Sequence, residues 1–365
     1  MSACKYVEID FKGFSNATQQ FLCHFSDAFI PIVRNLVRYE PQVSCICILL
    51  NIFHLIVLTR KSMRTSSINL LMAAVALVDI FSLSVSIKNK IETMIVNLYD
   101  CPLASSYLSV QVTILMFSIQ SFTRRCSTWL SFSIALIRTL VVRNPLNPTF
   151  EQLSRLKSGS YCVLIVFFIS FPISLLNFCQ YAITTSGYIG GCNQNETLYV
   201  MSLSKLFQDN NNFLLRAFDF IDGTVSKLIP CVLFPIVTFL LVIEVRKADK
   251  NSRKVSNRKD RNSSGKTTRL ILYLTVTFFF FEFPLGILGA VNSFVPLSIG
   301  IREIFIHFQA LFRFMLAINT STHILICLGL STQYRKTAKS VLCCGMKSIK
   351  VNKSNAPSVI SVSPI

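Results

Sequence analysis

Three arginines lie within one long apolar stretch of this chain, 117–146, and a fourth, Arg143, lies near its end. Arg124 and Arg125 are adjacent, and Arg138 follows Arg124 by 14 positions. A charge at bilayer depth costs roughly 3 kcal/mol or more, so such residues usually face a protein interior or a wet cavity. Fourteen helical residues span roughly 21 Å. Because each residue turns a helix by about 100°, Arg124 and Arg138 would lie near one face. We therefore expect a central helix with Arg124 in a cavity in its outer half and Arg138 at the inner mouth, while Arg125 points elsewhere.

A carboxylate, Glu282, interrupts a later apolar run at a depth that matches Arg124. Opposite charges inside a membrane pair because each alone is costly to bury. We predict an Arg124–Glu282 ion pair at the floor of a ligand cavity. A structural pair that never moves is an equally good interpretation.

More charged residues fall near the outer half of the predicted helices. The cations are Arg125, Lys227 and Arg313, and the acids that could neutralise them are Asp219, Asp222 and Glu303. This balance weakly favours a ligand with a carboxylate or several hydrogen-bond acceptors. The predicted ligand-binding residues are therefore Arg124, Arg125, Lys227, Glu282 and Arg313.

The composition indicates a polytopic membrane protein. Of 365 residues, 52% are hydrophobic and 15% are charged, whereas soluble domains carry about 25% charged residues. The net charge of +19 lies mostly in short connections between apolar runs, which excludes a nucleic-acid-binding stripe. The thirteen cysteines show no metal-ligand spacing, and no nucleophile–base pair is apparent. We expect neither an enzyme nor a bound cofactor or metal.

Seven apolar runs divide the chain, and each is long enough to form a membrane helix. They cover about 43–58, 68–87, 107–142, 161–182, 225–245, 270–295 and 304–330. Lys and Arg concentrate in connections 1–2, 3–4 and 5–6 and in the tail, which places these on the cytoplasmic side. The predicted fold is an all-α seven-helix membrane bundle with its N-terminus outside. It comprises an extracellular segment 1–41, a receptor-like domain 42–336 and a cytoplasmic tail 337–365, without a cleavable signal peptide.

Several local segments resemble the rhodopsin-like G protein-coupled receptors. They are Asn51 in LLNIFHLIVL, Asp79 in NLLMAAVALVDIF, SFSIALIRTLVVRNPL around Arg138, and Pro284 in TFFFFEFPLGI. More narrowly, RRCSTWLSFSIALIRTLVVRNP and the fifth apolar run resemble nematode serpentine receptors of class W, a group similar to FMRFamide-type neuropeptide receptors. The resemblance covers nearly the whole chain. It implies a heterotrimeric G protein as partner, with Arg138 and Pro145 at the coupling surface.

The sequence departs from the family pattern at several positions. Ile137 replaces the acid before the third-helix arginine, and Thr139 replaces the tyrosine after it. Glu282 stands in place of a tryptophan, and a segment beginning at His323 replaces Asn-Pro-x-x-Tyr. Because Arg138 lacks its usual neighbour, we expect Glu244 to substitute for the missing acid, or else high basal activity.

Other residues suggest a polar network and covalent modifications. Asn51, Asp79, Asn319 and His323 could form a polar cluster, which is either a sodium site or a water-filled structural network. By the resemblance, Cys101 and Cys192 would form a disulfide outside the cell, and Cys4 and Cys23 could form another. Asn16 and Asn195 lie in glycosylation triplets, and Cys343 and Cys344 are palmitoylation candidates.

Taken together, these patterns predict a multi-pass receptor in the plasma membrane of sensory or other neurons. An FMRFamide-like neuropeptide is the preferred ligand, and a small external molecule detected by chemosensing is the nearest alternative. A transporter or channel, in which intramembrane charges line a permeation path, is a more distant possibility. The lipid bilayer is an obligatory partner in each case.

Replacing Glu282 by Gln while retaining Arg124 should alter signalling or surface expression, because the substitution leaves a buried guanidinium without its counter-charge. Surface labelling and a G protein assay of the variant would measure both. Normal behaviour in both assays would rule out the predicted pair.

Overall fold

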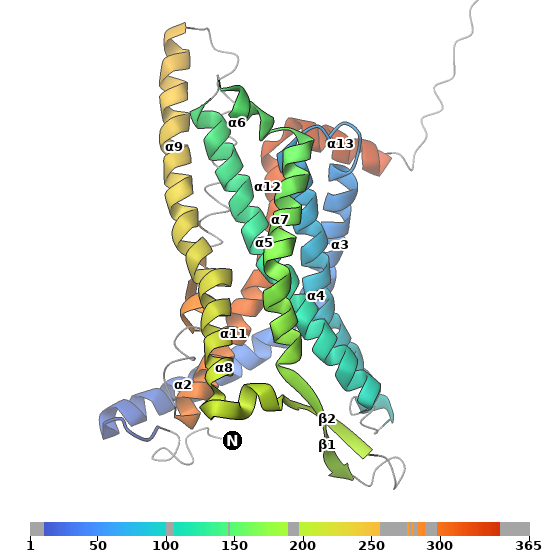
Figure 1. Cartoon of the computed structure of the whole chain (residues 1–365), viewed down its shortest axis with the longest axis vertical. Coiled ribbons are helices and arrows are strands. Elements are labelled where there is room, and N and C mark those ends of the chain that lie inside the picture. The colour runs from blue at the N-terminus through green and yellow to red at the C-terminus, as the bar shows by residue number, and fades with distance from the viewer. Residues whose placement is uncertain are drawn as a thin grey trace, which may run out of the picture.

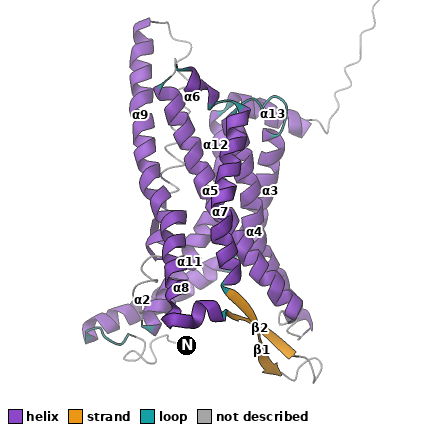
Figure 2. Ribbon diagram, viewed as in Figure 1, coloured by secondary structure: helices purple, strands orange, loops and turns teal. Residues whose placement is uncertain are grey.

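The computed structural model describes residues 11–99, 106–144, 147–188, 197–255, 276, 279–280, 283–288 and 298–343. Most of the helices run side by side along one direction (Figure 1), and one β-hairpin projects from an end of the bundle (Figure 2). The helices that follow predicted apolar runs are α3 (Glu40–Leu58), α4 (Ser67–Tyr99), α5 (Tyr107–Arg143), α7 (Leu156–Cys179), α9 (Ile229–Val255), α11 (Ile299–Asn319) and α12 (Thr322–Leu330).

Other elements lie outside the predicted runs. They are α2 (Asn16–Val37), α6 (Pro148–Gln152), β1 (Tyr181–Tyr188), β2 (Thr197–Leu203), α8 (Lys205–Gly223), the π-helix η2 (Thr224–Leu228) and α13 (Thr332–Cys343).

Six helical stretches of the described chain are long and apolar enough to cross a membrane. They are Glu40–Leu58, Ser67–Ile95, Tyr107–Arg143, Leu156–Cys179, Lys205–Glu244 and Ile299–Gly329. The predicted sixth run, 270–295, lies mostly outside the described residues, and 276, 279–280 and 283–288 within it are helical. The expected bundle of apolar helices is therefore confirmed for the part of the chain that is described.

Several predicted limits differ from the structure. The first apolar helix begins at Glu40, so the boundary expected after residue 41 falls inside α3. The fourth ends at Cys179, because the chain turns into the antiparallel hairpin β1–β2 at Tyr181. The fifth begins at Lys205, which is 20 residues earlier than expected. These errors arise because polar helical extensions carry no apolar signal.

The N-terminal helix α2 packs against α11 through aromatic rings. Phe29 lies 4.4 Å from Phe308 between ring centroids, and Phe25 lies 5.1 Å from Phe29. Pairs at such distances add about 0.5–1.5 kcal/mol beyond area burial. Figure 1 shows α2 and the hairpin at one end of the bundle, and α6 and α13 at the opposite end.

A glycine allows α7 to approach α4 closely. A Cβ atom at Gly159 would lie 3.0 Å from the backbone Cα and carbonyl oxygen of Ser67, which is closer than Cβ atoms normally approach backbone. The Ser67 amide also donates to the Ser154 carbonyl at 2.9 Å. Beyond this contact α7 exposes large apolar side chains, with Phe168 81% exposed, as expected of a helix that faces lipid.

The main apolar core joins α3, α4, α5, α7, α12 and α13. Tyr334 of α13 is fully buried in this core, and its hydroxyl lies 2.8 Å from Nδ1 of the buried His54 in α3. Burial raises the pKa of the Tyr334 phenol, so the hydroxyl keeps its proton at neutral pH. This contact fastens α13 to the first membrane helix.

The seventh apolar stretch is broken at Thr320–Ser321, between α11 and α12. The Thr320 hydroxyl donates to the Ala317 carbonyl at 2.8 Å, and the Thr322 hydroxyl donates to the Asn319 carbonyl at 2.7 Å. Hydroxyl groups that bond back onto the helix in this way compete with its backbone hydrogen bonds and bend it. The break therefore forms at a segment that has no proline.

Substituting Tyr334 by Phe should lower the free energy of unfolding by about 1–3 kcal/mol, because it leaves buried Nδ1 of His54 without a partner. Thermal unfolding of the purified receptor would measure this effect. Tyr161→Phe is the matched control, since Tyr161 is 67% exposed and its loss of a hydroxyl should change the melting temperature little. Equal melting temperatures for both variants would show that the contact contributes no stability.

Candidate functional site

Arg125, near the middle of α5, is 2% exposed and contacts two other helices. Its Nη1 atom donates to the Ser170 carbonyl at 3.0 Å and to the Ser174 hydroxyl at 2.8 Å, both on α7. Its Nε atom donates to the Ser226 hydroxyl of η2 at 2.7 Å. Its Nη2 atom forms an ion pair with Asp222 of α8. Arg125 therefore joins α5, α7 and the α8–η2 segment at one point.

A short π-helix shapes the far side of this cluster. The Ser226 hydroxyl in η2 donates to the Asp222 carboxylate at 2.8 Å, so this carboxylate accepts from both Arg125 and Ser226. A π-helical turn inserts one extra residue into a helix and occurs often at functional sites. Here it places the hydroxyl of Ser226 and the ammonium of Lys227 beside the same cavity.

A cavity of about 220 Å³ lies between α5, the α8–η2 segment and α11. Four of the five predicted ligand-binding residues line it, namely Arg124, Arg125, Lys227 and Arg313. Its other lining residues include Phe117, Gln120, Ser121, Asp222, Ser226 and Gln309. The fifth predicted residue, Glu282, lies outside the described residues, so its pairing with Arg124 stays a prediction.

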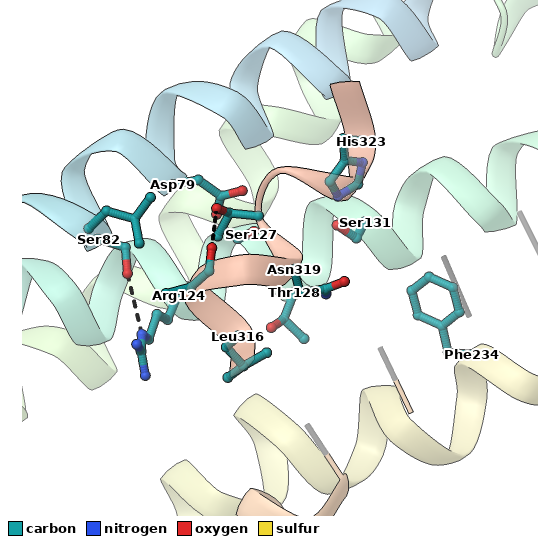
Figure 3. Close-up of a pocket in the computed structure, with 13 residues that line it drawn as sticks. Asp79, Ser82, Arg124, Ser127, Thr128, Ser131, Phe234, Leu316, Asn319 and His323 are labelled. Carbon is teal, nitrogen blue, oxygen red and sulfur yellow. Dashed lines mark hydrogen bonds between the residues drawn. The ribbon is translucent and has the colours of Figure 1, made fainter. Parts of the chain in front are cut away.

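A second and smaller cavity, of about 60 Å³, lies next to the first and shares Arg124, Thr128 and Leu316 with it. Asp79, Asn319 and His323, three members of the predicted polar network, line this cavity. Figure 3 shows their side chains around it, with Phe234 opposite. Nε of Arg124 donates to the Ser82 hydroxyl at 3.3 Å, as the figure also shows.

The fourth member of the predicted network, Asn51, is buried behind this cavity. Its Nδ2 atom donates to the Cys47 carbonyl at 3.0 Å and to the Thr320 hydroxyl at 3.4 Å. Asn51 therefore reaches the break in the seventh stretch without lining the cavity. No group of three or more His, Cys, Asp or Glu side chains suited to a metal ion occurs in the described part of the chain.

Arg138 lies half-buried near the other end of α5. The expectation that Glu244 replaces its missing acidic neighbour is wrong. Glu244 of α9 lies 3.8 Å from Nε of Arg143, one and a half turns further along α5. Within the described residues Arg138 forms no salt bridge. The pair Arg143–Glu244 instead links the last residue of α5 to the middle of α9.

The remaining predicted residues divide between described and undescribed parts. Asn16 is exposed at the first residue of α2, and Cys343 is exposed at the last residue of α13. Cys23 is disulfide-bonded, and its partner is outside the described residues. Also outside them are Cys4, Cys101, Pro145, Cys192, Asn195 and Cys344.

The serines that hold Arg125 were missed by the sequence analysis. On α7 the buried residues are Gly159, Val166, Ser170 and Ser174, which recur at helical spacing on one face. Two serines four residues apart on the buried face of an otherwise apolar helix were therefore a usable signal. Ser226 gave no comparable signal, because its position depends on the π-helical turn.

Replacing Asp222 by Asn should destabilise the receptor by about 3–5 kcal/mol, because it leaves the buried Arg125 charge unpaired. The double variant Arg125→Gln/Asp222→Asn should lose less than the sum of the two single variants. Thermal unfolding and surface expression would measure the coupling. Glu92→Gln is the matched control, because the i,i+4 pair Lys88–Glu92 is of a kind that contributes about 0.5 kcal/mol or less. Strictly additive losses would exclude a coupled pair.

Comparison with known proteins agrees with this geometry. The family model described as serpentine type 7TM GPCR chemoreceptor Srw matches residues 38–345. The chain is also 26% identical over 227 residues to the G-protein coupled receptor dmsr-1 of Caenorhabditis elegans. That match covers 60% of this chain and 44% of the relative, so it spans less than half of the relative's length. With a match over most of its length, this chain belongs to the Srw family of seven-transmembrane G protein-coupled receptors.

Proposed function

We propose that this receptor binds an extracellular ligand in the charged cavity of about 220 Å³ and activates a heterotrimeric G protein at the plasma membrane. A neuropeptide of the FMRFamide-like class is the proposed ligand. The observation that supports this function is the convergence of Arg124, Arg125, Lys227 and Arg313 on one cavity inside an apolar bundle. Charges kept at this depth in a membrane protein generally serve function.

The route from ligand to G protein would follow α5. Arg124 lines both cavities, and Arg138 lies 14 residues further along the same helix, or roughly 21 Å. The smaller cavity meets the break at Thr320, where α11 gives way to α12. A ligand that binds more tightly to one arrangement of these helices shifts the population toward it.

The matched family is described as one of chemoreceptors, and this supports a second candidate. In this second candidate function the ligand is a small external molecule. It would bind in the same cavity, and the G protein would bind the same coupling surface. Sensory neurons would be the proposed site of expression in that case, whereas a neuropeptide receptor would act in other neurons as well.

The ends of the chain have proposed roles that follow from an N-terminus outside the cell. Residues 1–41 would be extracellular, 42–336 would form the receptor domain, and 337–365 would be cytoplasmic. Exposure of Asn16 is compatible with glycosylation. Exposure of Cys343 at the end of α13 is compatible with palmitoylation next to the membrane, and Pro145 would lie at the coupling surface with Arg138.

Replacing Arg138 by Ala should reduce ligand-evoked G protein activation by about tenfold or more and leave surface expression intact, because Arg138 has no ion-pair partner in the described chain. The receptor would be co-expressed with a promiscuous G protein and exposed to amidated peptides and small odorants. Arg143→Ala is the matched control on the same helix, where only the pair with Glu244 is lost. A substrate current or flux without G protein would contradict the proposed function.

A further inference from the structure

The charged cavity is strongly cationic. Its described lining carries four cationic side chains and one carboxylate, that of Asp222. This carboxylate is already engaged, since it accepts from both Arg125 and Ser226. The described lining therefore has a net charge of +3. If Glu282 pairs with Arg124 as the sequence predicts, an excess of two positive charges remains.

The excess belongs to two lining residues that come from different elements. Lys227 lies in η2 and Arg313 lies in α11. Within the described residues neither forms a salt bridge within 4.0 Å. Each has an acidic residue farther than 4.0 Å away that attracts it. For Lys227 this residue is Asp219, and for Arg313 it is Glu40. Glu40 also accepts the Ser86 hydroxyl at 2.8 Å.

Such an arrangement favours an anion. Two cations that face one cavity repel each other, and the repulsion grows as the effective dielectric constant falls. A guanidinium binds a carboxylate with two parallel hydrogen bonds, while an ammonium acts as a compact point charge. Gln309 and Ser121 on the same lining add neutral hydrogen-bonding side chains, whereas Gln120 already donates from Nε2 to the Ser82 carbonyl at 3.1 Å.

We propose that the ligand carries a carboxylate that binds between Lys227 and Arg313. This inference rests on the proposed ligand cavity and specifies the chemistry that the cavity selects. A small organic acid or a peptide with a free C-terminus supplies the group directly. A C-terminally amidated peptide must supply it from an Asp or Glu side chain. A ligand whose deepest group is cationic is excluded, because it would add to the repulsion.

The cationic side chains of the cavity have two different roles. Arg125 is held by Asp222 and by hydroxyl and carbonyl oxygens of α7 and η2, so it serves the architecture. Lys227 and Arg313 have no such partners in the described chain, so they are available to a ligand. An anion between them would connect the fifth and seventh membrane stretches, because η2 and α11 belong to these.

The test uses pairs of probes that differ only in charge. They are hexanoate and hexanamide, N-acetylphenylalanine and its amide, and the peptide Phe-Met-Arg-Phe with a free or an amidated C-terminus. Thermal stabilisation of the full-length receptor in nanodiscs, at probe concentrations up to the millimolar range, reports binding without any G protein. We expect the probes with a carboxylate to stabilise the receptor and their amide partners to do so at least about tenfold more weakly, which corresponds to about 1.4 kcal/mol. The two peptides and the two small acids distinguish the sources of the carboxylate.

Substitutions of single residues test whether the acids bind at Lys227 and Arg313. Lys227→Gln and Arg313→Gln should each weaken stabilisation by the acids by about tenfold or more. Neither should lower the melting temperature without probe, because each removes one of two cations that repel each other. Arg313→Lys, which retains the charge, should keep most of the response. Lys88→Gln is the matched control, because Lys88 is already paired with Glu92 at 2.7 Å. It should not change the response.

Equal stabilisation by acids and amides, no stabilisation by any acid, or undiminished binding in both glutamine variants would overturn the carboxylate assignment. The signalling proposal would survive these results if any ligand activates a G protein through Arg138. Conversely, stabilisation by acids without coupling would retain the anion site and contradict the signalling proposal.

Discussion

One buried guanidinium constrains the arrangement of three membrane segments. An arginine side chain has five N–H donors and a permanent charge, so burying Arg125 in an apolar bundle requires several acceptors and a counter-charge. Ser170 and Ser174 provide acceptors on α7, Ser226 provides one on η2, and Asp222 provides the charge on α8. Because α7 otherwise turns apolar side chains outward, this cluster fixes which face of α7 meets the bundle.

The same cluster explains how the cavity retains its positive charge. Asp222 is the carboxylate of the described cavity lining, and it is committed to Arg125 and Ser226. It forms no salt bridge with Lys227, which lies five residues further along. Ser226 and Lys227 of the π-helical turn both line the cavity, but only Ser226 accepts a hydrogen bond from Arg125. Structural stability and an open charged site are thus provided by neighbouring residues of one turn.

Much of the bundle could be predicted from composition, because long apolar runs separated by basic connections leave few alternatives. Convergence of Arg124, Arg125, Lys227 and Arg313 was also predictable in outline, since intramembrane charges seek a shared interior. The hairpin β1–β2 and the long polar start of the fifth stretch were not predictable in this way. Their residues mix polar and apolar types without a long apolar run, and their structure depends on contacts at the end of the bundle.

Failures at the level of single residues have a common physical cause. Glu244 was expected near Arg138 but lies next to Arg143, an error of little more than one turn along α5. Facing positions on two helices depend on their relative shift, which one sequence does not reveal. On the fifth stretch the π-helix η2 adds a further displacement of the helical face. Three consecutive asparagines with positive φ, Asn210–Asn212, also interrupt α8. Asparagine adopts that conformation more readily than most residues.

The contact between α2 and α11 has a mechanical consequence. The rings of Phe25, Phe29 and Phe308 pack α11 against the N-terminal helix, while the hydroxyl-bonded break at Thr320 separates α11 from α12. The seventh stretch is therefore two rods joined by a pivot, and α11 is the braced rod. A torque that reaches α12 can turn it and α13 while α11 keeps its orientation.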